Sequence, residues 1–66
     1  MKLRINGEDR HFEEPLSIEA LLVKLEIDIK GTAVELNREV VPRSRHSETF
    51  LNDGDHVEII RMTGGG

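Results

Sequence analysis

The chain as printed ends in Gly64, Gly65 and Gly66, and the group that could react there is the α-carboxylate of the last glycine. Glycine has no Cβ, so three glycines in a row form a narrow segment that can adopt almost any backbone conformation. Such a segment suits insertion into the active site of another protein, although terminal glycines also occur at chain ends without a role. We therefore expect residues 64–66 to be a flexible C-terminal tail, with Gly66 as the candidate reactive residue.

The other residue types offer little chemistry. The chain has no cysteine, which excludes a disulfide, a thiol nucleophile and a thiolate metal site. His11, His46 and His56 lie far apart in the sequence and lack the spacing of metal ligands, so we expect surface histidines and no metal site. Asp53 and Asp55 flank a glycine, which is typical of a turn rather than of two carboxylates held about a pocket for acid and base catalysis.

Charge and aromatic content argue against a nucleic-acid partner. Thirteen acidic and nine basic residues give a formal net charge of −4, the wrong sign for binding phosphates. Phe12 and Phe50 are the only aromatic residues, too few for a platform on which bases stack. Arg43 and Arg45 could contact a phosphate or the acidic groups of a partner, but we expect them to be solvated loop charges.

Length and hydropathy indicate one small domain. A chain of 66 residues buries only roughly 60% of the surface that its unfolded form exposes, which leaves no room for a deep enzyme cleft. Hydrophobic residues make up 36% and charged residues 33% of the chain, a composition typical of globular proteins. No apolar run approaches membrane-spanning length and no secretory signal is visible, so we expect a cytoplasmic protein without a membrane partner.

The first half of the sequence predicts a β-hairpin followed by a helix. Residues 1–6 alternate apolar and polar side chains, as in a strand with one buried face, and Asn6-Gly7 is a tight-turn sequence. A second strand is expected over residues 10–14, closed by Pro15. Ser17 is a good N-cap for the helix. The apolar stripe that should face the sheet recurs at i, i+3, i+4 and i+7, with Ile18, Leu21, Leu22 and Leu25.

The second half predicts further strands joined by turns. Residues 32–37 and 40–41 should pair across a turn, and Pro42 limits further pairing. Residues 43–47 are polar and are expected to form a turn or a single helical turn. A short strand, a turn and the last strand follow at residues 49–51, 52–55 and 56–62. The pattern predicts an α+β fold with one helix on one face of the sheet and the other face open.

The open face of the predicted sheet carries a mixed set of side chains. Polar groups cover part of it, from Lys2, Arg4, Glu35 and Glu58. Ile60 and Met62 do not, and they stand next to the glycine tail. If exposed, these two residues would form an apolar patch of the kind that docks a partner protein. The alternative is that Met62 folds over the edge of the sheet as part of the core.

Several segments occur together in this sequence: Ala33-Val34-Glu35-Leu36-Asn37, Val40-Val41-Pro42-Arg43, Leu51 to Ile59 with its Asp53-Gly54-Asp55 turn, and the final Gly-Gly. With this set the chain resembles, over its whole length, the ThiS family of bacterial sulfur carriers in thiamine biosynthesis. The resemblance implies a ubiquitin-like β-grasp fold, with a mixed sheet of four to five strands and one main helix packed on one face. It also implies that residues 1–6 and 56–62 lie parallel at the centre of the sheet. The implied organisation is a β-grasp domain over residues 1–63 followed by the tail.

The resemblance also implies a chemistry for Gly66. An E1-like adenylyltransferase would join the carboxylate to AMP from ATP, because a carboxylate anion is itself a poor electrophile. A persulfide sulfur from a cysteine enzyme would then replace AMP, leaving a thiocarboxylate that a thiazole synthase uses as its sulfur source. Gly65 and Gly64 would form the slender approach that enters these active sites. On this reading the protein is a carried substrate that binds no cofactor itself, and it is not an enzyme.

Other functions share the same tail. A carrier for molybdopterin synthesis or tRNA thiolation would use identical chemistry with another acceptor. The molybdopterin subunit is typically longer and approaches its final Gly-Gly through an apolar segment containing proline, whereas this chain has Arg61-Met62-Thr63, which favours the thiazole branch. Many ThiS relatives carry an apolar residue at the position of Thr63, so tail docking can differ in detail. A ubiquitin-like modifier that is joined to lysines and a plain β-grasp interaction module are further alternatives.

Overall fold

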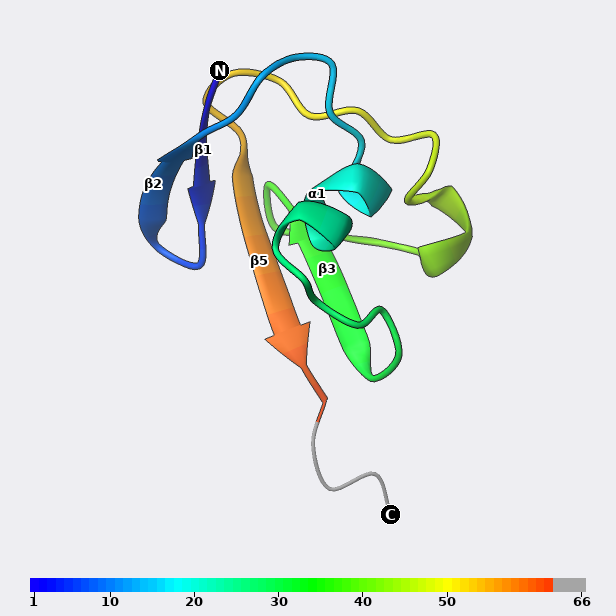
Figure 1. Cartoon of the computed structure of the whole chain (residues 1–66). Coiled ribbons are helices and arrows are strands. Elements are labelled where there is room, and N and C mark those ends of the chain that lie inside the picture. Colours follow the sequence, from blue (N-terminus) through cyan, green and yellow to red (C-terminus); the bar gives the residue numbers. More distant parts are fainter. Residues whose placement is uncertain (63–66) are drawn as a thin grey trace.

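The structure is a computed structural model that describes residues 1–62. Its elements follow in the order β1 (Lys2–Ile5), β2 (Glu8–His11), α1 (Ile18–Lys24), β3 (Thr32–Leu36), β4 (Glu39–Val41), a 3-10 turn (Arg43–Arg45) and β5 (His56–Arg61). Within the described part, the expected α+β arrangement is confirmed, and α1 lies across one face of a mixed sheet (Figure 1).

The strand order of the sheet is β2-β1-β5-β3-β4, so the last strand is the central one. β1 and β5 are parallel, with Arg4 beside His56 and Ile5 beside Val57. The pairs β1–β2, β3–β4 and β3–β5 are antiparallel. The predicted parallel placement of the first and last strands at the centre of the sheet is therefore confirmed.

The hairpin between β1 and β2 turns at Asn6-Gly7, as predicted, but β2 begins earlier than expected. Asn6 and Gly7 have φ of 49° and 84°, the conformation that a two-residue turn between antiparallel strands requires. Because the turn is only two residues long, Ile5 pairs with Glu8 and β2 ends at His11. The prediction of a second strand over residues 10–14 was thus wrong in register, since it allowed too many residues for the turn.

The helix begins where its cap was predicted. The hydroxyl of Ser17 accepts a hydrogen bond from the backbone N–H of Ala20 at 3.1 Å, which satisfies a donor that the first turn would otherwise leave free. The stripe of the helix packs against the sheet, and Leu25 is the C-cap. The core consists of nine buried apolar residues: Leu3, Ile5, Leu16, Ile18, Leu21, Leu22, Val34, Leu51 and Val57.

The connection between β4 and β5 departs from prediction at residues 49–51. Residues 49–51 form no sheet strand: they run beside the lead-in to the helix, where Phe50 makes an isolated bridge with Ser17 and the Leu51 N–H donates to the Leu16 carbonyl at 2.9 Å. The predicted single helical turn is confirmed as the 3-10 turn.

His46, predicted at the surface, is only 2% exposed. Its Nε2 lies 3.0 Å from the carbonyl of Val41, and its own carbonyl accepts from the N–H of Glu19 at 3.1 Å. The correction has a physical reason: the ring and backbone of His46 satisfy polar groups at the end of β4 and at the start of α1. Within residues 1–62 the Nδ1 atom of this ring has no hydrogen-bond partner.

Candidate functional site

The residues that the sequence marks as reactive, Gly64, Gly65 and Gly66, lie outside the described residues. The structure instead defines the base of the tail, which is the end of β5 from Ile59 to Arg61 together with Met62. This base belongs to the central strand, which runs past the β1–β2 hairpin (Figure 1). The predicted boundary between domain and tail at residue 63 also falls outside the described part, and it stays a prediction.

On the β3 side, backbone hydrogen bonds hold the base of the tail. β3 pairs with β5 as far as Thr32 and Arg61. One residue further along, the N–H of Met62 donates to the carbonyl of Gly31 at 2.7 Å. Gly31 has φ of 70°, a conformation that glycine adopts without strain, and this conformation reverses the chain into β3. Met62 is therefore the last residue that the described structure ties to the sheet.

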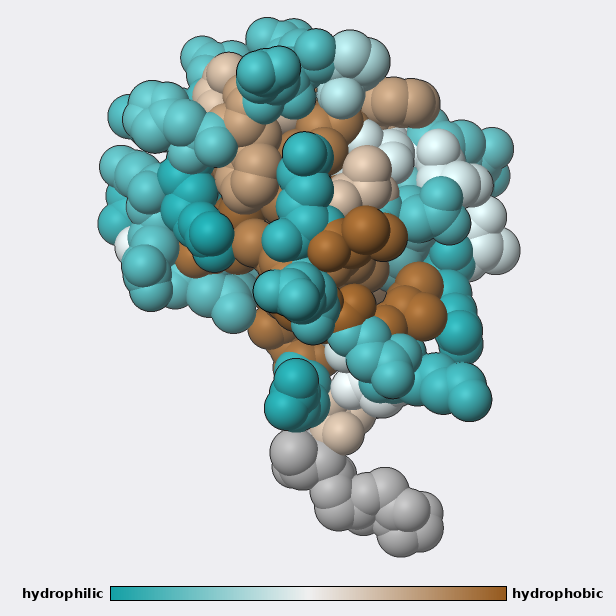
Figure 2. All heavy atoms as spheres, viewed as in Figure 1, coloured by the Kyte–Doolittle hydropathy of each residue, from teal (hydrophilic) through white to brown (hydrophobic). Residues whose placement is uncertain are grey.

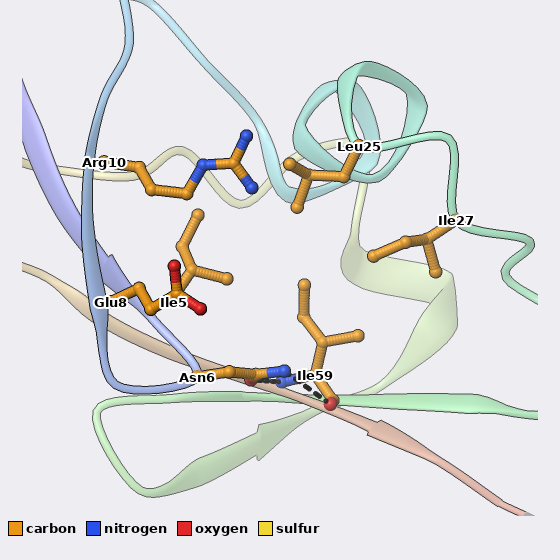
Figure 3. A pocket seen from close by; sticks show the side chains of 7 residues that line it. All are labelled: Ile5, Asn6, Glu8, Arg10, Leu25, Ile27 and Ile59. Carbon is orange, nitrogen blue, oxygen red and sulfur yellow. Dashed lines mark hydrogen bonds between the residues drawn. The ribbon is translucent and has the colours of Figure 1, made fainter.

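On the β1 side, the side-chain amide of Asn6 holds the base of the tail by hydrogen bonds. Asn6 Oδ1 accepts from the N–H of Ile59 at 2.7 Å, and Asn6 Nδ2 donates to the carbonyl of Ile59 at 3.3 Å (Figure 3). The N–H of Asn6 also donates to the carbonyl of Val57 at 2.9 Å. β1 thus reaches Ile59 through a side chain, beyond the point where its own backbone turns away.

Ile60 and Met62 are exposed, with 42% and 60% of their surface accessible. The alternative that Met62 folds into the core is therefore wrong. Ile60 stands opposite Ala33 and alternates with the buried Val57, so it faces away from α1. The apolar patch that the sequence predicted beside the tail is present, and its role in docking a partner stays a prediction.

Charges on the open face are separated along the strands. Lys2 and Arg4 of β1 lie 4.0 and 3.8 Å from the carboxylate of Asp9, and all three side chains are about half exposed. Glu35 and Glu58 stand directly opposite each other on β3 and β5. A partner that covers Ile60 therefore meets the carboxylates of Glu35 and Glu58 at the neighbouring positions of β3 and β5.

A shallow hollow of about 210 Å³ lies beside the base of the tail on the helix side of the sheet (Figure 3). Its lining is mixed: apolar side chains come from the core edge, and Asn6, Glu8 and Arg10 add polar and charged groups. The residues that line it are Ile5, Asn6, Glu8, Arg10, Leu25, Ile27 and Ile59. Leu25, Ile27 and Ile59 are only partly buried where they pack against the core. Figure 2 shows that hydrophobic surface is exposed between hydrophilic side chains on one face of the molecule.

The remaining candidate groups have structural roles. Asp55 Oδ2 accepts from the N–H of Asn52 at 2.7 Å, which closes the turn as predicted. Asp53 lies in the same turn, but its Oδ1 accepts from the N–H of Lys2 at 2.7 Å and so ties the turn to the start of β1. Arg43 and Arg45 are exposed, and Arg45 lies 3.9 Å from Glu48.

Residues 1–62 lack two kinds of feature. Within that range, no group of three or more histidine or acidic residues is placed to hold a metal ion. The same range contains no helix long and apolar enough to cross a membrane.

The comparison with protein families decides the identity of the chain. The model described as the ThiS family matches residues 3–66. The chain belongs to the ThiS family. A crystal structure of the thiamine biosynthesis protein ThiS from Geobacter metallireducens superposes with a TM-score of 0.89 at 36% identity, covering all of both chains. The expected β-grasp fold, with one helix on a five-stranded mixed sheet, is thereby confirmed.

Proteins of two different lengths are similar in sequence to this chain. The sulfur carrier protein ThiS of Bacillus subtilis is 34% identical over 65 residues, covering 97% of this chain and 98% of the relative. A thiazole synthase of Paramagnetospirillum magneticum is 48% identical over 66 residues, but this chain spans only 20% of its length. Members of the ThiS family are small sulfur carriers rather than catalysts, in agreement with the prediction that the chain is not an enzyme.

The sequence interpretation missed the part of this site that Asn6 forms. Asn6 was assigned to a turn because Asn-Gly is a turn sequence, and that assignment is confirmed. Its second role depends on Ile59, 53 positions away along the chain. The signal that could have revealed this role is the position of the Asn6-Gly7 turn directly after β1. A residue at that position lies beside the strand that neighbours β1 in the sheet.

Proposed function

We propose that this chain carries sulfur for the formation of the thiazole ring of thiamine, as a thiocarboxylate on Gly66. The observation that carries the proposal is the family match, which runs through the final glycine. The ordered base at Ile59 to Met62 supports it, because a carrier must present its reactive end at a fixed place on its body. We also assign the chain to the cytoplasm, where the activating enzyme would find ATP and the sulfur donor.

The first step activates the carboxylate. At neutral pH the α-carboxylate is an anion, since its ordinary pKa is about 3.3–3.7. An E1-like adenylyltransferase supplies ATP, the carboxylate oxygen attacks the α-phosphorus, and pyrophosphate leaves. The product is an acyl adenylate in which AMP is a good leaving group. ATP is bound by the activating enzyme and not by this chain.

The second step introduces sulfur. The terminal sulfur of a cysteine persulfide attacks the acyl carbon, AMP leaves, and Gly66 becomes joined to the donor through an acyl disulfide. A thiol then attacks the donor sulfur of that bond. The two-electron reduction frees the thiocarboxylate of Gly66, and the donor and the thiol remain as a disulfide. A thiazole synthase takes the sulfur from the thiocarboxylate.

The geometry of the body fits these steps. Four residues follow Met62, and an extended segment of that length spans at most about 13–14 Å. That reach is enough for Gly66 to enter an active site while the body remains outside it. Ile60 and Met62 stand at the base of the segment, so we assign them to the surface that docks the partner enzymes. Gly65 and Gly64 supply the narrow approach.

The acceptor is assigned from the relatives. A relative that is 48% identical and one that is 35% identical are both named thiazole synthase, and this chain spans 20% of each. A carrier segment that shares a polypeptide with the acceptor activity supports thiazole synthase as the partner here. No observation on this chain favours molybdopterin synthesis or tRNA thiolation.

Intact mass spectrometry tests the proposal. The protein ending at Gly66 is incubated with ATP, Mg²⁺, the activating enzyme, a persulfide donor and a thiol. The expected result is a mass increase equal to the replacement of one oxygen by sulfur, and omission of ATP should abolish it. An adduct on a lysine would instead indicate a ubiquitin-like modifier, and an unchanged mass would refute the carrier function.

A further inference from the structure

β1 and β3 are each followed by an asparagine whose side chain forms a hydrogen bond with β5. Asn6 follows β1 with φ of 49°, and Asn37 follows β3 with φ of 50°. Asn37 Oδ1 accepts from the N–H of His56 at 2.9 Å, while Asn6 holds Ile59 as described above. The same type of side-chain hydrogen bond is therefore made to His56 and to Ile59 of β5, from opposite sides of the strand.

The two contacts differ in what they hold. At His56 the strand lies between β1 and β3, because Arg4 of β1 pairs with His56. Ile59 lies beyond the paired residues of β1, and there the amide of Asn6 takes the place of a backbone peptide by offering one acceptor and one donor to one residue. Ile59 is also only three residues before Met62, from which the reactive segment departs.

We propose that Asn6 is a positioning residue for the Gly66 carboxylate, which fixes the direction in which β5 leaves the sheet. The inference rests on the proposed function. Backbone bonds from β3 restrain the strand end on one side, and the Asn6 amide restrains it on the other. Without that amide, the segment from Ile59 onward can swing away from β1, and every residue beyond it moves with it.

The expected consequence is kinetic. Displacement of a reacting group by about 1 Å can cost on the order of a hundredfold in rate. If the strand end moves but still returns to its native position, the loss of rate should be smaller. We therefore expect about a tenfold loss in the maximal rate of adenylation. The KM for the protein as substrate should change little, because the side chains of Ile60 and Met62 are unchanged and both remain exposed to the partner.

Glycine substitutions distinguish the proposed positioning role of Asn6 from its role in forming the turn. Asn6→Gly and Asn37→Gly both keep a residue that adopts positive φ easily, and each removes one side-chain amide. They form a matched pair, since each loses a contact with β5, but only the first loses it near the tail. Asn6→Asp is the rescue variant, because its carboxylate still accepts from the N–H of Ile59.

Two readouts are needed. Amide hydrogen exchange of Ile59 and Met62 in the protein alone measures opening of the strand end, and steady-state adenylation measures its consequence. We expect Asn6→Gly to exchange faster at both amides and to lose about tenfold in maximal rate, Asn6→Asp to recover most of it, and Asn37→Gly to stay within about twofold of wild type.

Each possible outcome either supports or overturns the proposal. Equal loss of rate in the two glycine variants would show a general effect of stability and overturn the proposal. So would an unchanged rate or unchanged exchange at Met62 in Asn6→Gly. If the wild-type protein is not adenylated at all, the proposed function fails and the kinetic role of Asn6 fails with it. The exchange data then still establish whether Asn6 holds the strand end.

Discussion

The two ends of β5 are built for different purposes. Near its start, Val57 is 1% exposed and lies between β1 and β3, with the core on one side. Near its end, Ile60 and Met62 are exposed, and backbone pairing comes from β3 alone, with one amide on the β1 side. Within one strand, a buried side chain is thus followed, a few residues later, by side chains that are exposed to a partner.

The difference shows how a small domain can hold a reactive end in place without an active site of its own. In the first half of the strand, the side chain of Val57 is part of the core and fixes the strand in space. The exposed half keeps its hydrogen bonds but gives up burial, so its side chains remain available to a partner. Stability and function should therefore be separable by mutation along β5.

The largest expected effect lies beyond the described residues. Gly65→Val adds a branched side chain where two active sites must close around the tail, so adenylation should fall by at least about a hundredfold. ATP–pyrophosphate exchange with the activating enzyme measures this step. Circular dichroism should show an unchanged fold. Normal exchange activity in this variant would contradict the narrow approach, and Gly64→Val should have a smaller effect.

A core substitution in the first half of the strand should affect stability instead. Val57→Ala removes two buried methyl groups and should lower the free energy of unfolding by about 2 kcal/mol. Urea denaturation followed by circular dichroism measures the loss. Ile60→Ala, in the exposed half, should cost less than about 1 kcal/mol. Similar losses in the two variants would remove the contrast between the two halves of β5.

A polar substitution at the strand end should weaken docking. If Met62 is buried against a partner, Met62→Ser should raise the KM for adenylation about tenfold, corresponding to part of the transfer free energy of its side chain. Val23→Ser is the matched control, since Val23 is also exposed but lies on α1, across the sheet. Equal effects from the two substitutions would argue against a docking surface at Ile60 and Met62.

Local signals in the sequence predicted much of the body. The Ser17 cap, the helix stripe and the two-residue turn at Asn6-Gly7 each depend on neighbours within one turn or one hairpin. The parallel pairing of β1 with β5 came from the family resemblance and is confirmed by the register of Ile5 and Val57. The boundaries of β2 were wrong because turn length decides register, and one residue changes every pair.

Contacts made at long range could not be predicted in the same way. His46 looks like any polar loop residue until β4 and α1 supply its partners. Asn6 and Asn37 look like turn residues until β5 passes between them. In each case the sequence determines the local conformation, whereas the partner depends on which strand the fold brings alongside.

The central claim is that sulfur travels on Gly66, and an isotope label follows it directly. A persulfide donor labelled with heavy sulfur is incubated with the protein, ATP, the activating enzyme and a thiol, and the product is fragmented in the mass spectrometer. Addition of thiazole synthase and its other substrates completes the transfer. We predict that the label appears on the C-terminal fragment containing Gly66 and then in the thiazole product. Label found in the thiazole but never on Gly66, or on Gly66 but not transferred, would contradict the account.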